Sequence, residues 1–385
     1  MAIKNVAFAR ESMLRRLYTI NFIDAFIAGV TTVLIPLLML ERGIDVVTIG
    51  LVFAAAPLAK IVIRLAGAAI ADSLGDRIIY VASSVSDFLL SITYLVSSTA
   101  TGFAAGKLLD GARESLIWSA IRPSLMAAAP EKRHFILADL LSGRLVYNAF
   151  GSLAVGILFV FGGYDLPLLA IAVLSIYAVF SSLRMKNIHK AETHVRASDF
   201  SPFGRSQRFY ETAGAFTIGS ILYVVSVYMV LPLYFYMKGF SLGEIGLFYA
   251  GYYLINGSVL HIISRHKVGT MIAAVAGTAT YCLGLSGVVL APHALIPVFF
   301  LIMASGDAGL AILWEEINYS VTKSSRKRAT DLAVILIPSQ IGVMIASGAA
   351  GIAIATIGFA PIFALLALSE IIFSAWCVRL SRMKG

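Results

Sequence analysis

Apolar runs recur along the whole of this 385-residue chain and constrain its fold more than any other feature. Each run has about 20 residues, enough to cross a hydrocarbon core as an α-helix. The runs are continuous and do not alternate as barrel strands would, so helices are the expected spanning elements. With 59% hydrophobic and 13% charged residues, no sizeable soluble domain is expected. We predict an all-α polytopic membrane protein with twelve spans at 17–40, 45–70, 78–98, 101–128, 136–161, 165–184, 211–237, 242–263, 268–290, 293–319, 331–355 and 359–379.

The Lys and Arg residues outside these spans lie almost entirely on one side of the predicted membrane. The termini and the even-numbered connections carry them, whereas the other side has only Arg42 and Lys238. Positive loops stay cytoplasmic, so we expect both termini and the central loop in the cytoplasm and the protein in the plasma or inner membrane. The net charge of +9 is therefore a topology signal, and no nucleic-acid partner is expected.

The two halves of the sequence repeat each other at a constant offset of 196 residues. The offset aligns Ile49-Gly50-Leu51 with Ile245-Gly246-Leu247, and Trp118 with Trp314. Internal repeats of this length predict two six-helix halves with a site between them near the membrane midplane. The expected division is 1–184 for the first bundle, 185–208 for a cytoplasmic linker and 209–385 for the second bundle.

A short charged hinge joins the second and third spans, with the sequence Gly67-Ala68-Ala69-Ile70-Ala71-Asp72-Ser73-Leu74-Gly75-Asp76-Arg77. Its small residue, Asp, Gly and basic residue resemble the loop signature of the major facilitator superfamily. Ala68 stands where that signature usually begins with glycine. The resemblance extends to the twelve spans and the repeat. It implies a secondary active transporter that works by alternating access, with Asp72, Gly75 and Arg77 acting in gating.

Six cations lie inside the predicted spans, all of them in the first half: Lys60, Arg64, Lys107, Arg113, Arg122 and Arg144. A charge in the bilayer costs several kcal/mol unless it is paired or wetted, so each needs a reason. Helical rise places Asp24, Arg64, Arg122 and Arg144 in one layer. One hypothesis is a basic site for an anionic substrate, with Asp24 as its counter-charge or proton carrier. The alternative is internal neutralisation by acidic residues.

The fourth span carries Lys107, Asp110, Glu114 and Trp118 on one helical face. This pattern is typical of a proton relay or of a structural ion-pair ladder, and we include Asp110 and Glu114 among the proton-coupling candidates. In the second half, Trp314-Glu315-Glu316 offers the best such candidates, because acids without cations in a low dielectric tend to protonate.

Aromatic and amide side chains follow one face of the eighth span at Tyr249, Tyr252, Tyr253 and Asn256. A mid-helix face of this kind is typical either of a cavity that stacks an organic solute or of helix packing. The substrate-binding candidates are therefore Arg64, Trp118, Arg122, Arg144, Tyr252, Asn256 and Trp314.

Motifs for other chemistry are missing from the sequence. Gly102–Lys107 is one residue short of a P-loop, no zinc spacing occurs, and Cys282 and Cys377 both lie in apolar runs. We expect no enzyme activity, no cofactor and no metal. A gradient must then drive transport.

The sequence thus favours a monomeric, proton-coupled transporter of a small organic solute, and the family resemblance favours export. The alternatives are an importer of an organic or inorganic anion that uses the intramembrane arginines, and a transporter-like receptor or scaffold without turnover.

Overall fold

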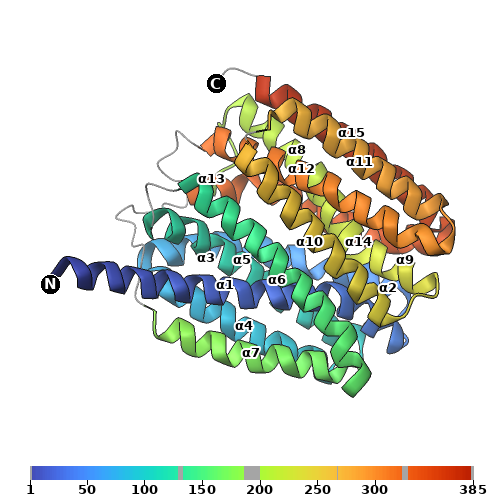
Figure 1. Ribbon diagram of the computed structural model, residues 1–385, viewed down its shortest axis with the longest axis horizontal. Coiled ribbons are helices and arrows are strands. Elements are labelled where there is room, and N and C mark those ends of the chain that lie inside the picture. The colour runs from blue at the N-terminus through green and yellow to red at the C-terminus, as the bar shows by residue number, and fades with distance from the viewer. Residues whose placement is uncertain (1, 129–132, 186–199, 267, 323–327, 383–385) are drawn as a thin grey trace.

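The computed structural model describes residues 2–128, 133–185, 200–266, 268–322 and 328–382, and these form a bundle of helices (Figure 1). The first half contains α1 (Ala2–Glu41), α2 (Val46–Phe53), α3 (Ala55–Leu74), α4 (Asp76–Val96), α5 (Ala100–Ala128), α6 (Arg133–Gly162) and α7 (Asp165–Leu183). The second half contains α8 (Gln207–Val225), η3 (Ser226–Val230), α9 (Leu231–Met237), α10 (Leu242–His266), α11 (Thr270–Leu290), η4 (His293–Leu295), α12 (Ile296–Thr322), α13 (Arg328–Ile335), α14 (Ile337–Ile357) and α15 (Phe359–Arg382).

The described helices make the twelve passes that the sequence predicts, and three of these passes are interrupted. The second is broken between α2 and α3, the seventh contains the π-helical turn η3, and the eleventh is broken between α13 and α14. Ten passes are long and apolar enough to cross a membrane by length and composition. The other two are α5, which carries several charges, and α10, which is rich in tyrosine.

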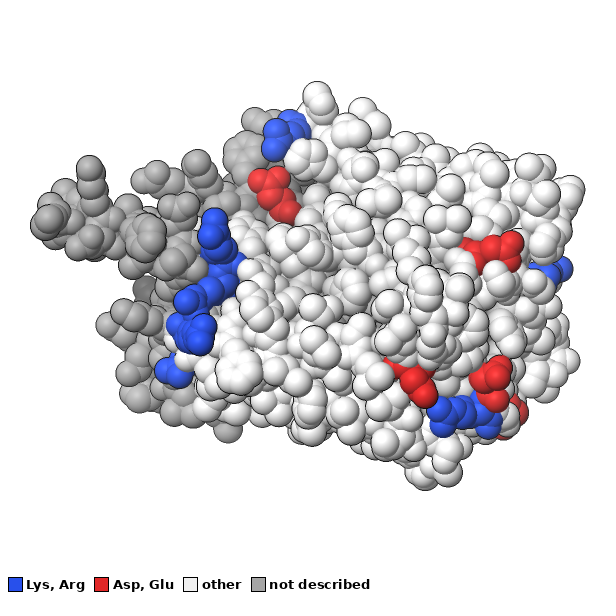
Figure 2. Space-filling model, turned by 60° about the horizontal axis from the view of Figure 1, so that its bottom comes forward, with Lys and Arg blue, Asp and Glu red and all other residues white. Residues whose placement is uncertain are grey.

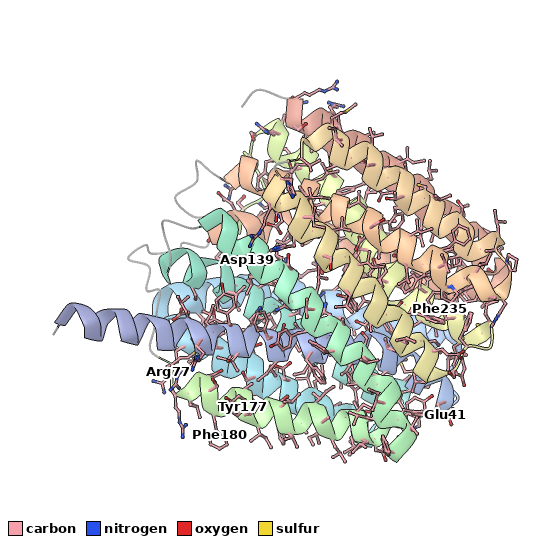
Figure 3. All side chains as sticks on the ribbon, viewed as in Figure 1. Glu41, Arg77, Asp139, Tyr177, Phe180 and Phe235 are labelled. Atoms are coloured by element: carbon pink, nitrogen blue, oxygen red, sulfur yellow. The ribbon has the colours of Figure 1, made fainter. Side chains whose placement is uncertain are left out.

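Both chain termini lie at one end of the bundle, which we call the terminal end (Figure 1). The opposite, distal end holds Glu41, at the end of α1 (Figure 3). On the face in Figure 2, Lys and Arg lie towards the two ends, and a broad band between them carries other residues. Tyr177 and Phe180 on α7 are 59% and 58% exposed and point outward, as lipid-facing side chains do. The surface therefore has the pattern of a membrane-embedded bundle.

Short turns join the passes at the distal end. Between α1 and α2, Asp45 caps α2 by accepting hydrogen bonds from the backbone and hydroxyl of Thr48. The side-chain hydrogen bond from Thr48 lowers the pKa of the exposed Asp45 carboxyl. This cap satisfies a backbone N–H in the first turn of α2, where the helix itself provides no carbonyl partner.

The charged hinge of the sequence forms the turn between α3 and α4. Gly75 has a φ of 91°, which an L side chain rarely adopts, so glycine lets the chain reverse between the two helices. The next residue, Asp76, is buried and accepts a hydrogen bond from the Ser124 hydroxyl of α5 at 2.6 Å. The hinge is thus anchored to α5.

Two glycines related by the repeat bring the halves into backbone contact. A Cβ on Gly50 would lie 2.6 Å from the carbonyl oxygen of Ser347 on α14. A Cβ on Gly246 would lie 2.6 Å from the carbonyl oxygen of Ser152 on α6. Gly50 and Gly246 differ by 196 positions, so the two contacts are equivalent under the repeat. The first half packs against the second in the same way at both places.

A third glycine, Gly29, sets the distance between α1 and α6, and this contact can be tested. A Cβ on Gly29 would lie 2.1 Å from the Asn148 carbonyl oxygen, which is backbone and cannot move aside. Gly29→Ala should therefore destabilise the protein by about 1–3 kcal/mol through overpacking. The measurement is the unfolding temperature of the detergent-solubilised protein.

The matched control is Gly348→Ala on α14. Its new methyl group would meet its nearest neighbour, the Leu51 side chain, at an ordinary 3.5 Å. An equal loss of stability in both variants would contradict the close contact at Gly29.

Candidate functional site

Asp24 on α1 lies at the centre of a buried charge network in the first half. Arg113 donates to one of its carboxylate oxygens at 2.7 Å, and Arg144 donates to the other at 2.7 Å. Arg144 also donates to the side-chain oxygen of Asn21, and its guanidinium lies 4.8 Å from the ring centre of Trp118. With 1% exposure, Asp24 is held by two charge-assisted hydrogen bonds that join α1 to α5 and α6.

The network continues along α5 through Arg113. Its guanidinium donates to Asp110 at 2.9 Å and lies 3.6 Å from Asp87 of α4. Lys107 donates to the second oxygen of Asp110 at 3.1 Å, and its ammonium lies 4.2 Å from the ring centre of Phe53. Residues one turn apart on a helix can pair in this way, so α5 carries both partners of two ion pairs.

The remaining acid of α5, Glu114, pairs with Lys60 of α3 at 2.6 Å. The two acids on the predicted face of α5 therefore have different partners: Asp110 pairs with cations of α5 itself, and Glu114 pairs with Lys60 of α3. Lys60 also lines a shallow pocket between α3 and the broken pass of the second half, together with Arg64, Leu336 and Gln340. The pocket places Arg64 next to the second half of the protein.

Charge balance follows from these contacts. Four acids and four cations meet within the described part of the first half: Asp24, Asp87, Asp110, Glu114, Lys60, Lys107, Arg113 and Arg144. Removing an ion from water costs several kcal/mol, and mutual attraction offsets this cost only where each charge has a partner. The arrangement gives the charges of both signs such partners.

A different polar cluster lies between α10 and α12 in the second half. The Tyr252 hydroxyl and the Asn256 amide both donate to the same oxygen of Asp307, at 2.8 and 2.6 Å. Tyr252 stacks on Phe300 with ring centres 4.8 Å apart and meets Tyr253 edge to face at 5.5 Å. Asn256 thus faces a carboxylate and not a basic residue.

The other second-half candidates lie elsewhere in the bundle. Trp314 stacks on Phe216 with ring centres 4.0 Å apart and packs against the large apolar core, which contains residues of both halves. Glu315 is partly buried on α12. Glu370 of α15 is fully buried and accepts a hydrogen bond from Thr278 of α11 at 3.2 Å.

Three candidate side chains lie outside the described residues, although their backbones belong to helices. They are Arg122 on α5, Glu316 on α12 and Asp72 on α3. Asp139 of α6 is half-exposed and lies 3.7 Å from His261 and 4.0 Å from Arg265, both of α10 (Figure 3).

Comparisons with known proteins identify the family and the fold. The sequence matches the Major Facilitator Superfamily over residues 17–330. The chain belongs to the major facilitator superfamily. The solved D-xylose–proton symporter has a similar fold, with a TM-score of 0.72 and 13% identity over 95% of this chain and 97% of that chain. The nucleoside transporter NupG, solved as a mutant, gives a TM-score of 0.73 and 13% identity over 95% and 98% of the chains. No curated protein sequence matched significantly.

Membership of the major facilitator superfamily makes this a multi-pass membrane protein and a secondary transporter, not an enzyme. A small-molecule substrate follows from that class. The sequence prediction of the family and of the all-helical fold is therefore confirmed.

Sequence reasoning assigned no role to three residues of these polar clusters. Arg113 was one of six intramembrane cations and carried no assigned role, although it contacts three acids. Asp87 of α4 was not among the candidates, although it is buried next to Arg113. The two hydrogen-bond partners of Asp307 were not predicted, because they depend on the packing of α10 on α12. An intramembrane ionisable residue is a signal in itself.

The coupling between Asp24 and Arg144 can be measured by a double-mutant cycle. Asp24→Asn leaves two buried guanidiniums short of a partner and should destabilise the protein by about 3–5 kcal/mol, and Arg144→Gln should act in the same direction. The double variant should cost less than the sum of the two, because it removes both charges of the pair. The measurement is denaturant unfolding in detergent micelles. Simple additivity would contradict a direct pair.

Proposed function

We propose that this protein is a proton-coupled secondary transporter of a small organic solute and that Asp24 carries the coupled proton. The observation that supports the proposal is the position of Asp24 between Arg113 and Arg144, which joins α1 to α5 and α6. A fold similar to that of the D-xylose–proton symporter is consistent with proton coupling.

Alternating access provides the link between proton and conformation. Helices of one half move relative to the other as the central site changes sides. When the arginines separate from Asp24, a carboxylate is left in a low-dielectric interior, and protonation is the least costly way to neutralise it. Proton binding then favours one arrangement of α1, α5 and α6, and ion pairing favours the other.

The remaining candidates take supporting roles in this proposal. Asp110 and Glu114 hold the neighbouring cations and relay protons, as the predicted face of α5 suggests. Glu315 and Glu316 remain proposed coupling residues of the second half. Asp72, Gly75 and Arg77 gate the terminal end, where the hinge is anchored to α5 through Asp76.

Substrate contacts are proposed at the interface between the halves. Trp118 lies under Arg144, next to the coupling residue, and Arg64 lines a pocket shared with the second half. Arg122 and Trp314 remain proposed contacts, as do Tyr252 and Asn256. The anion importer is less well supported, because Arg144 faces Asp24 and Asn21 in place of a free anion. For direction, the family resemblance favours export, and for topology the positive charges favour cytoplasmic termini.

Proton coupling can be tested in proteoliposomes that contain a trapped pH-sensitive dye. A panel of sugars, nucleosides, carboxylic acids and amines is added on either side, and solute-dependent pH change and solute movement are both recorded. Native protein should couple the movement of at least one solute to protons. Asp24→Asn should abolish the proton movement and retain solute exchange, whereas Asp24→Glu should restore the coupling at least in part.

The matched control is Asp165→Asn, which neutralises an exposed carboxylate at the start of α7. It should couple like the native protein at equal amounts of folded protein per liposome. An unchanged ratio of protons to solute in Asp24→Asn would refute the proposal for this residue.

A further inference from the structure

The two halves treat their buried charges differently. In the first half, the acids of the network face Lys or Arg. In the second half, Asp307 is 8% exposed, and its hydrogen bonds with the described residues come from two neutral donors, Tyr252 and Asn256. Among the described residues, no Lys, Arg or His forms an ion pair with Asp307. Its negative charge is therefore available to a ligand.

The hydrogen bonds around Asp307 leave acceptors unused. Both neutral donors share one carboxylate oxygen, and the second oxygen accepts no hydrogen bond from the described residues. The side-chain oxygen of Asn256 is also buried without a donor, and Asn256 as a whole is 2% exposed. A buried acceptor without a donor is costly, so the Asn256 oxygen, together with the unused oxygen of Asp307, fits a ligand that brings N–H groups.

Aromatic rings lie beside the same carboxylate. Tyr252 and Tyr253 meet edge to face, and the Tyr252 hydroxyl donates to Asp307. Faces of aromatic rings attract cations, and tyrosine-lined sites with a carboxylate suit ammonium groups.

We propose that Asp307, Asn256 and the tyrosines Tyr252 and Tyr253 form a binding site for the ammonium group of an organic amine. Asp307 provides the charge, Asn256 accepts an N–H, and the tyrosines contact the carbon skeleton. The proposal rests on the proposed function in that the bound amine is the transported solute. It narrows the substrate class from a small organic solute to an organic cation.

The test compares three probes that share one ring and differ in charge. These are benzylamine, which is a cation at pH 7, the neutral benzyl alcohol and the anion benzoate. Calorimetric titration of the detergent-solubilised full chain should show saturable binding of benzylamine. Benzyl alcohol should bind at least tenfold more weakly, and benzoate should not bind. Equal binding of the three probes, or no binding of benzylamine, would overturn the proposal.

Variants assign the preference to this site. Asp307→Asn should weaken benzylamine binding at least tenfold and remove the preference over benzyl alcohol. Glu370→Gln neutralises another buried carboxylate of the same half and should keep the preference. If Asp307→Asn does not fold, Asn256→Leu tests the same site and should weaken benzylamine several-fold with benzyl alcohol unchanged. Native-like benzylamine binding in Asp307→Asn, with or without a loss of proton-driven flux, would overturn the proposal.

The outcome is separable from that of proton coupling at Asp24. Asp24 belongs to the first half, and the control variant Asp165→Asn, which alters neither site, should bind benzylamine with native affinity. If the proton assay shows no role for Asp24, the benzylamine preference and its loss in Asp307→Asn stand by themselves. If benzylamine does not bind, the proton assay still decides the role of Asp24.

Discussion

The ion pairs of Asp24 are the interaction on which the first half depends. One carboxylate receives a guanidinium from α5 and another from α6, so three helices meet at a single residue of α1. Inside a membrane-spanning bundle these charges are not hydrated, so each needs a partner of opposite charge within the protein. The positions of α1, α5 and α6 are therefore linked through the charge of one side chain, and the proposed proton coupling uses this link.

Close helix contacts complement this polar centre. Gly29 lets α1 approach the backbone of α6, and Gly50 and Gly246 let each half touch the other at equivalent places. Small residues of this kind allow strong van der Waals packing where lipid provides little hydrophobic drive. The halves are alike in these contacts but differ in charge, because the first balances its acids with cations and the second leaves Asp307 with neutral donors. In the proposed mechanism, proton coupling thus belongs to the first half and recognition of the ammonium group to the second.

Much of the fold could be predicted because each span carries its own signal. The length and continuity of the apolar runs predicted the helices, and the constant offset between Gly50 and Gly246 predicted that the halves are built alike. The candidate site was predicted in outline, since helical rise placed Asp24 and Arg144 at one depth. Whether the two side chains pair depends on how α1 and α6 are oriented about their axes, and no local sequence pattern specifies this orientation. The same limit explains why Arg113 and Asp87 were missed.

The sequence by itself determined the class of molecule: a helical, twelve-pass membrane transporter with charges that cannot face lipid. The helices and their passes follow from composition and spacing along the chain, and the transporter class follows from the family resemblance. The tertiary structure alone decided which charges neutralise each other and which do not. Glu114 paired with Lys60 of another helix, and Asp307 met Tyr252 and Asn256 in place of a cation. Such choices depend on the angle and depth at which helices distant in sequence pack, and a few ångströms decide between a closed ion pair and an open binding site.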